Sequence, residues 1–268
     1  TPYDVTTFTS TVSANHGWSH YNPGIESAKF NADGSKLYIR YSSYQSSNRV
    51  IREITTDSAF NPSGTIVGTY TLKSIGIYDF DFSYDGNTMY VLHSDNQIYQ
   101  YGLTTPWSVA TKYDTGIIFN AAVIDSSPRT IQISDDGTKM FVLGTTDDRV
   151  YQIDMATAFF MSTATYNDIK TDVISGAVKA FITSDGSRVV VQPTNEQRLT
   201  LYSMNGDLPV VLTPAAGPAW AGDITTSPIA LKKTREISMD GYNGLQGFVD
   251  GGNKLITISG ASISAHNM

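Results

Sequence analysis

The sequence predicts an all-β chain, because one short pattern recurs five times and each copy is built from strand-forming residues. The pattern is an apolar residue, an Asp-Gly or similar corner and a run rich in apolar residues. Its clearest copies span 30–38, 82–90 and 133–141, and weaker ones span 182–190 and 248–256. The corner glycines stand at 34, 86, 137, 186 and 252, so the steps are 52, 51, 49 and 66 residues. Short strands repeating every 40 to 50 residues are typical of a β-propeller.

Each copy supplies four strands. Asp-Gly gives the positive φ that a tight hairpin needs, so one strand ends and the next begins at each corner. Runs with alternating apolar and polar residues predict the third strands, at 49–54, 97–101, 149–153 and 198–202. Less regular fourth strands follow, for example at 111–119 and 162–169. Four strands make one propeller blade.

The two ends of the chain complement each other. Residues 263–268 read as a third strand with no fourth strand after it. Residues 1–5, Thr-Pro-Tyr-Asp-Val, match Thr-Pro-Trp-Ser-Val at 105–109, which follows a third strand. We therefore expect the N-terminus to supply the outer strand of the last blade and to close a five-bladed ring, which removes open sheet edges. The alternative is a coincidental match.

The repeat spans nearly the whole chain and predicts one domain, 1–268. The expected blades are 24–75, 76–125, 126–176, 177–215, and 240–268 together with 1–12. The segment 212–244 is expected to be a long inter-blade excursion or a degenerate blade fragment. A sixth blade would need about 45 residues, far more than the longer last interval adds.

Composition narrows the class of partner. The chain has 18 basic and 25 acidic residues, a formal net charge of −7 and no cysteine. This balance argues against unspecific binding to nucleic acid or anionic lipid, and no apolar run approaches the 18 residues that predict a membrane span. The chain starts at Thr, so either a leader was removed or it is a piece of a longer polypeptide. A surface low in charge and rich in Tyr, Ser and Asn is typical of proteins that bind glycans or other proteins outside cells, and equally of inert all-β proteins.

The candidate ligand-binding residues lie in loops on the face opposite the Asp-Gly corners. They are His16, Trp18, His20 and Tyr21 in one loop, and Tyr44 and Gln45 in the next. An aromatic ring beside hydrogen-bonding groups is a common way to hold sugars and planar ligands. In the alternative interpretation Trp18 packs between blades and both histidines face water. We expect no metal site and no cofactor.

Acidic loop residues give a second, catalytic hypothesis. Asp95, Asp147, Asp148 and Glu196 occupy corresponding loops, and carboxylates that converge near the axis could bind a cation or hydrolyse glycosides. Acidic residues are also ordinary turn formers. The sequence contains no Gly-x-Ser-x-Gly elbow, HExxH or phosphate loop, so no catalytic residue is predicted. Trp107, at a repeated position, is predicted to be a packing residue.

The segment 82–109 resembles a known repeat. Its elements are Phe-Ser-Tyr-Asp-Gly-Asn-Thr-Met-Tyr-Val-Leu, Ile-Tyr-Gln-Tyr and Leu-Thr-Thr-Pro-Trp-Ser-Val, similar to the YVTN-type propeller repeat of bacterial secreted and surface proteins. The Thr-Pro-Trp variant resembles repeats in phage tail and virion proteins. The resemblance covers 24–160 well and the rest loosely, and Ala32, Tyr84, Asp135 and Ser184 replace the usual corner proline. It implies a scaffold, and it transfers no catalytic residue.

The resulting expectation is a non-catalytic interaction or structural module at a virion or extracellular surface. Its partners would be other virion or surface proteins, or a host glycan, with no nucleic acid and no membrane insertion. The alternative is a secreted glycan-active enzyme or lectin with its site at the propeller axis.

Overall fold

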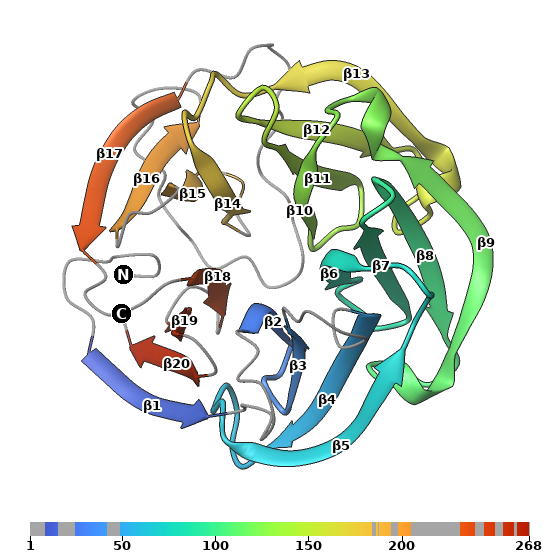
Figure 1. Cartoon of the computed structure of the whole chain (residues 1–268), viewed down its shortest axis with the longest axis vertical. Helices are drawn as coiled ribbons and strands as arrows, with labels where there is room; N and C mark the ends of the chain where they lie inside the picture. Colours follow the sequence, from blue (N-terminus) through green and yellow to red (C-terminus); the bar gives the residue numbers. More distant parts are fainter. Residues whose placement is uncertain are drawn as a thin grey trace.

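The computed structural model describes residues 9–15, 25–41, 49–183, 186, 188–193, 198–204, 231–238, 244–249, 254–259 and 262–267. Their strands form five four-stranded antiparallel sheets that lie around a common centre (Figure 1). These residues also contain three single-turn 3₁₀ helices, η2 (Val109–Thr111), η3 (Ala121–Val123) and η4 (Met161–Thr163). In this part of the chain no helix is long and apolar enough to cross a bilayer.

Four of the sheets follow the chain from the centre outwards. The first contains β2 (Ile25–Phe30), β3 (Lys36–Tyr41), β4 (Val50–Thr56) and β5 (Gly64–Thr71). The second contains β6 (Ile77–Phe82), β7 (Thr88–His93), β8 (Gln97–Leu103) and β9 (Lys112–Asn120). The third contains β10 (Pro128–Ile133), β11 (Lys139–Gly144), β12 (Arg149–Met155) and β13 (Ala164–Lys170). The fourth contains β14 (Ala177–Ile182), β15 (Arg188–Pro193), β16 (Arg198–Met204) and β17 (Leu231–Ser238).

The last sheet combines the two ends of the chain. It contains β18 (Gly244–Val249), β19 (Lys254–Ser259), β20 (Ser262–Asn267) and, outermost, β1 (Thr9–Asn15). β1 pairs antiparallel with β20, with Ala14 opposite Ile263. The pairing strand therefore lies later in the chain than residues 1–5, whose sequence match suggested the pairing. Residues 1–5 themselves lie outside the described residues.

The segment 212–244 was expected to be a long inter-blade excursion or a degenerate blade fragment, and the first of these needs a correction. It contains β17, which pairs with β16 from Arg198–Ser238 to Met204–Leu231. The fourth sheet therefore takes its outer strand from beyond residue 215, the expected end of that blade. The Lys-Lys-Thr-Arg run at 232–235 is part of this strand.

The hydrophobic core lies between the sheets. Each cluster of buried side chains draws on two neighbouring sheets: one joins Tyr38 and Ile51 to the second sheet, and another joins Tyr90 and Ile98 to the third. A further cluster joins the first sheet to Ile256 and its neighbours in the last. In strands such as β7 and β11 five consecutive residues are buried, because both faces of these strands are covered by neighbouring sheets.

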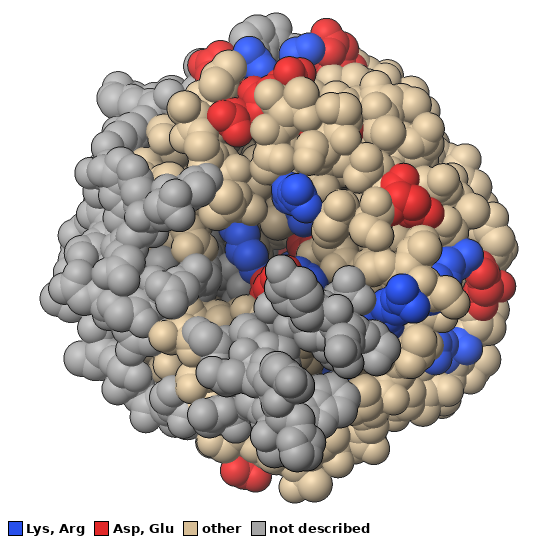
Figure 2. All heavy atoms as spheres, viewed as in Figure 1, with Lys and Arg blue, Asp and Glu red and all other residues tan. Residues whose placement is uncertain are grey.

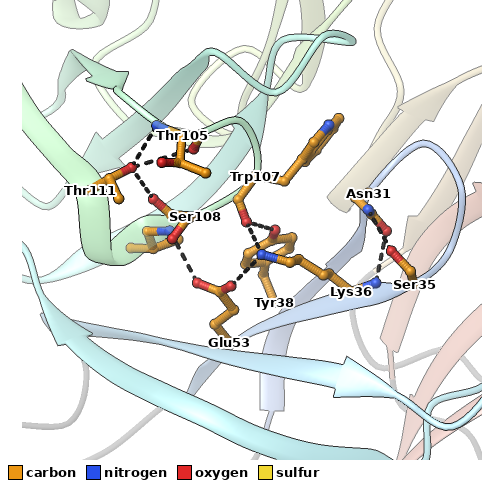
Figure 3. Close-up of polar contacts among 10 residues, drawn as sticks. Asn31, Ser35, Lys36, Tyr38, Glu53, Thr105, Trp107, Ser108 and Thr111 are labelled. Atoms are coloured by element: carbon orange, nitrogen blue, oxygen red, sulfur yellow. Dashed lines mark hydrogen bonds and ion pairs between the residues drawn. The ribbon is translucent and has the colours of Figure 1, made fainter.

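Aromatic residues ahead of the outer strands β9 and β13 link neighbouring sheets. Trp107 has a φ of 60°, and its N–H donates to the Gly86 carbonyl at the corner of its own sheet (2.9 Å). Its carbonyl oxygen accepts from the Tyr38 hydroxyl (2.6 Å) and the Lys36 ammonium (2.7 Å) of the first sheet (Figure 3). Glu53 completes the link by accepting from the Val109 N–H (3.0 Å). Trp107 is a packing residue, as predicted.

The same link recurs one sheet further on. Phe159 has a φ of 61°, its N–H donates to the Gly137 carbonyl, and its carbonyl accepts from Tyr90 (2.6 Å) and Gln100 (3.2 Å). Phe60, with a φ of 55°, donates to the Gly34 carbonyl in the same way. Non-glycine residues seldom adopt positive φ. That three aromatic residues at corresponding positions do so, each bonded to its corner glycine, shows that this conformation is a recurring part of the repeat.

Prediction: a glycine is needed at the corner for two reasons. The backbone has a positive φ there, and the overlying aromatic ring leaves no room for a Cβ atom. A Cβ on Gly86 (φ +71°) would lie 2.3 Å from Trp107 ring atoms, whereas a Cβ on Gly116 (φ +73°) meets nothing within 4 Å. Gly116→Ala should cost about 1 kcal/mol of unfolding free energy for the positive φ alone. Gly86→Ala should cost at least about 2 kcal/mol more, because Trp107 must move. Equal losses in urea unfolding would refute the role of the ring.

Candidate functional site

The six predicted ligand-binding residues lie outside the described residues. They are His16, Trp18, His20, Tyr21, Tyr44 and Gln45. The structure therefore leaves these predictions as they stand.

The other two histidines of the chain are buried. His93 Nδ1 lies 3.1 Å from the Gly76 carbonyl oxygen, and burial lowers its pKa. His266 Nε2 lies 2.8 Å from the Thr257 hydroxyl, and burial lowers its pKa as well. Both side chains support loops and strands within a sheet. Among the described residues no group of three or more His, Asp or Glu side chains could hold a metal ion.

The acidic loop residues that the structure describes accept hydrogen bonds from nearby protein groups. Asp95 accepts from the Tyr99 hydroxyl (2.8 Å), and Asp147 accepts from the Tyr151 hydroxyl (3.0 Å). Asp148 accepts from the N–H of Gly176 (2.9 Å). Asp95 and Asp147 thus stabilise their own hairpins, and Asp148 joins its hairpin to the loop before β14. Glu196 lies outside the described residues.

Polar side chains on the innermost strands reach across to the backbone of the next sheet. Asp79 accepts from the Ile131 N–H (3.0 Å), and Asp81 accepts from the Ile133 N–H (2.8 Å). Gln132 then holds both backbone groups of Ile182, accepting from its N–H (2.7 Å) and donating to its carbonyl (2.7 Å). An innermost strand has no further strand beside it, so these side chains pair backbone groups that would otherwise be left open.

The spacing of these contacts fixes the direction of the strands. Moving from Asp79 to Asp81 moves the partner from Ile131 to Ile133, so β6 and β10 run parallel. Each of the first four innermost strands also has a β-bulge near its start, after which Ser27, Asp79, Thr130 and Lys179 resume the register. Bulges re-aim side chains at the rim of a sheet.

A hollow lies among the four innermost strands β2, β6, β10 and β14. Its polar lining residues are Ser27, Lys29, Asp79, Thr130, Gln132 and Lys179. The space open to the centre of a water-sized molecule is about 20 Å³, enough for one small group. Figure 2 shows the centre of one face hollowed, with basic and acidic side chains visible inside. The structure therefore places a mixed-charge site at the axis.

The charges around this hollow are mostly paired. Lys29 lies 3.6 Å from Asp81, and Arg40 forms an ion pair with Glu26. Asp79 accepts from the Ser27 hydroxyl (2.6 Å) as well as from Ile131. Burial, together with the charges of Asp81 and Asp136, raises the pKa of Asp135 to about 6. Sequence reasoning missed this cluster. Its signal in the sequence is the set of polar residues that interrupt the apolar strands before each corner.

Comparison with solved structures identifies the fold. The chain is similar to the β-propeller domain of Cps50 (Swd1) from Myceliophteria thermophila, with a TM-score of 0.50 and 10% identity over 98% of this chain and 100% of that one. The chain is a β-propeller. The identity is too low to transfer any function.

Two Bacteroides proteins described as 6-phosphogluconolactonases also match. The protein from Bacteroides uniformis gives a TM-score of 0.47 and 12% identity, and that from Bacteroides fragilis gives 0.49 and 14%. The matches cover 86% and 83% of this chain and 62% of each of theirs. No protein-family model matches the sequence, and the comparison with curated proteins finds no similar one.

Prediction: removing the Gln132 link should destabilise the fold. Gln132→Leu leaves the N–H and carbonyl of Ile182 without their side-chain partner, which should cost about 2 kcal/mol. Gln97→Leu is the matched control, because the Gln97 side chain makes only a 3.5 Å contact with Tyr99. Chemical unfolding of both variants measures the difference, and a Gln132 variant as stable as the control would contradict the link.

Prediction: Asp135 makes the protein less stable as pH rises from about 4 to about 6. An unfolded Asp loses its proton near 3.8, whereas the folded Asp135 keeps it to about 6, so ionisation favours unfolding across that window. Asp135→Asn should flatten this part of the pH profile and raise stability at pH 7 by about 1 kcal/mol. The exposed Asp172 provides the control, and a profile as flat for Asp172→Asn would count against the assignment.

Proposed function

We propose that this chain is a non-catalytic interaction module, a closed five-bladed ring that holds a set of variable loops on one rigid face. The supporting observation is that polar side chains of the repeats are used in contacts within the scaffold. Asp79, Asp81 and Gln132 join the backbones of neighbouring sheets. Asp95 and Asp147 secure their own hairpins. These groups build the scaffold, and recognition falls to the loops.

The ring closure in this proposal rests on the last sheet. β1 joins residues near the start of the chain to β20 at its end, and β18 of that sheet contacts β2 and β14 on either side. A sheet shared by both termini ties the first and last repeats together, which protects edges and stiffens the platform.

The parallel innermost strands support a division between two faces. Because β6 and β10 run in the same direction, their Asp-Gly corners point to one face and their opposite hairpin loops to the other. The corners are nearly uniform in sequence, whereas the opposite loops differ from repeat to repeat. The loop-bearing face is therefore the proposed contact surface.

The proposed setting is a virion surface or tail, or another extracellular surface. Its partner there would be a neighbouring surface protein or a host glycan. This part rests on the Thr-Pro-Trp repeat variant, and on a surface that is low in charge and rich in Tyr, Ser and Asn. Such side chains offer large contact area with adaptable hydrogen bonds.

Prediction: the double variant Trp18→Ala/Tyr44→Ala should weaken attachment to host cells or arrayed glycans at least tenfold, because interface aromatics carry much of the binding energy. Tyr84→Ala provides the control, since Tyr84 is 49% exposed beside the corner at Gly86, on the opposite face. Attachment unchanged in the double variant, or lost equally in the control, would reject the loop-bearing face as the contact surface.

A further inference from the structure

The central hollow departs from the repeat at the fourth sheet. The first residue after the bulge is Asp79 in the second sheet but Lys179 in the fourth, and the position of Asp81 and Gln132 is taken by Phe181. The second and third sheets thus present groups that join the next sheet. The fourth sheet places a cation at the axis instead.

Lys179 has no carboxylate within ion-pair distance among the described residues, unlike Lys29 and Arg40. Its ammonium donates only to the Glu26 backbone carbonyl. Asp79 lies beyond ion-pair distance, and its oxygens already accept from Ser27 and Ile131. A cation held in a half-enclosed place without a counter-ion is costly.

The electrostatic environment of Lys179 also disfavours its charged form. Burial lowers the pKa of Lys179 to about 8, Arg40 and Lys29 lower it further, and Asp79 and Glu26 oppose the change. Lys29, Asp79 and Lys179 line the hollow, and Arg40 and Glu26 act on Lys179 from nearby. Because Lys29 pairs with Asp81 and Arg40 with Glu26, Lys179 and Asp79 are the two of these charged side chains left without an ion pair among the described residues, and the Asp79 oxygens already accept two hydrogen bonds.

We propose that the axial hollow binds a single carboxylate-sized oxyanion, with Lys179 as its counter-ion and Thr130 and Lys29 on the surrounding wall. The free space of about 20 Å³ accommodates one small group between these walls. The ligand is therefore a small free oxyanion or the carboxylate of a larger acidic molecule. The carboxyl group of Asp79 lines the same hollow, so an added anion should bind only weakly, with an affinity in about the millimolar range.

The test uses the intact protein and sodium acetate, exchanged for sodium chloride at constant ionic strength. The pKa of the Lys179 ammonium is followed by NMR, with its signal assigned from its loss in Lys179→Gln. An anion about 4 Å away should raise this pKa by about one unit, with saturation at millimolar acetate. The exposed-edge variant Lys170→Gln should keep the full response.

Lys179→Arg keeps the charge and serves where Lys179→Gln fails to fold. It should bind acetate, detected by calorimetry, within about tenfold of the wild type. Inorganic phosphate in place of acetate separates the two sources: equal binding indicates a general oxyanion site, and acetate alone indicates a carboxylate. A Lys179 pKa that acetate and phosphate both leave unchanged would overturn the proposal.

Discussion

The propeller depends on how the innermost strands satisfy the backbone edge that faces the axis. Such an edge has no further strand to pair with, and buried backbone groups without partners are costly. Here side chains of one sheet accept hydrogen bonds from the backbone N–H groups of the next sheet. Asp81 accepts from Ile133, and Gln132 accepts from Ile182. Asp81 and Gln132 each stand one residue before the end of their inner strand, and each contacts the last residue of the next inner strand, so the same offset repeats across these two contacts.

A second set of contacts works further out and explains the aromatic residues. Trp107 folds back on the corner of its own sheet and offers its carbonyl to Tyr38 of the preceding one. The strained φ is tolerated because ring packing and three hydrogen bonds over-determine it. The second sheet is thus bonded to each of its neighbours at two radii, near the axis and beside the outer strand. This double attachment suits a platform whose loops vary while its frame does not.

The sequence predicted the parts of this design that are local. Asp-Gly corners and alternating strands follow from neighbouring residues, so the strands and their repeat could be predicted. The contacts between sheets join residues about 50 positions apart, such as Asp79 and Ile131, and alternation does not reveal which side chains meet. Phe60 and Phe159 were missed because neither has the proline that precedes Trp107. β17 was missed because the long interval before it hides the repeat.

The inner strand of the fourth sheet carries residues that do not serve the stability of the scaffold. The position of Lys179 is occupied by Ser27, Asp79 and Thr130 in the first three sheets, and that of Phe181 by Lys29, Asp81 and Gln132, all of them polar. Among these side chains Asp79, Asp81 and Gln132 accept from the backbone of the next sheet. Lys179 makes no such link, and Phe181 cannot accept a backbone N–H as Asp81 does. A substitution that removes a stabilising contact and adds an uncompensated charge is a stability cost. Such a cost is expected at a functional position, and an anion that pairs with Lys179 would offset it when bound.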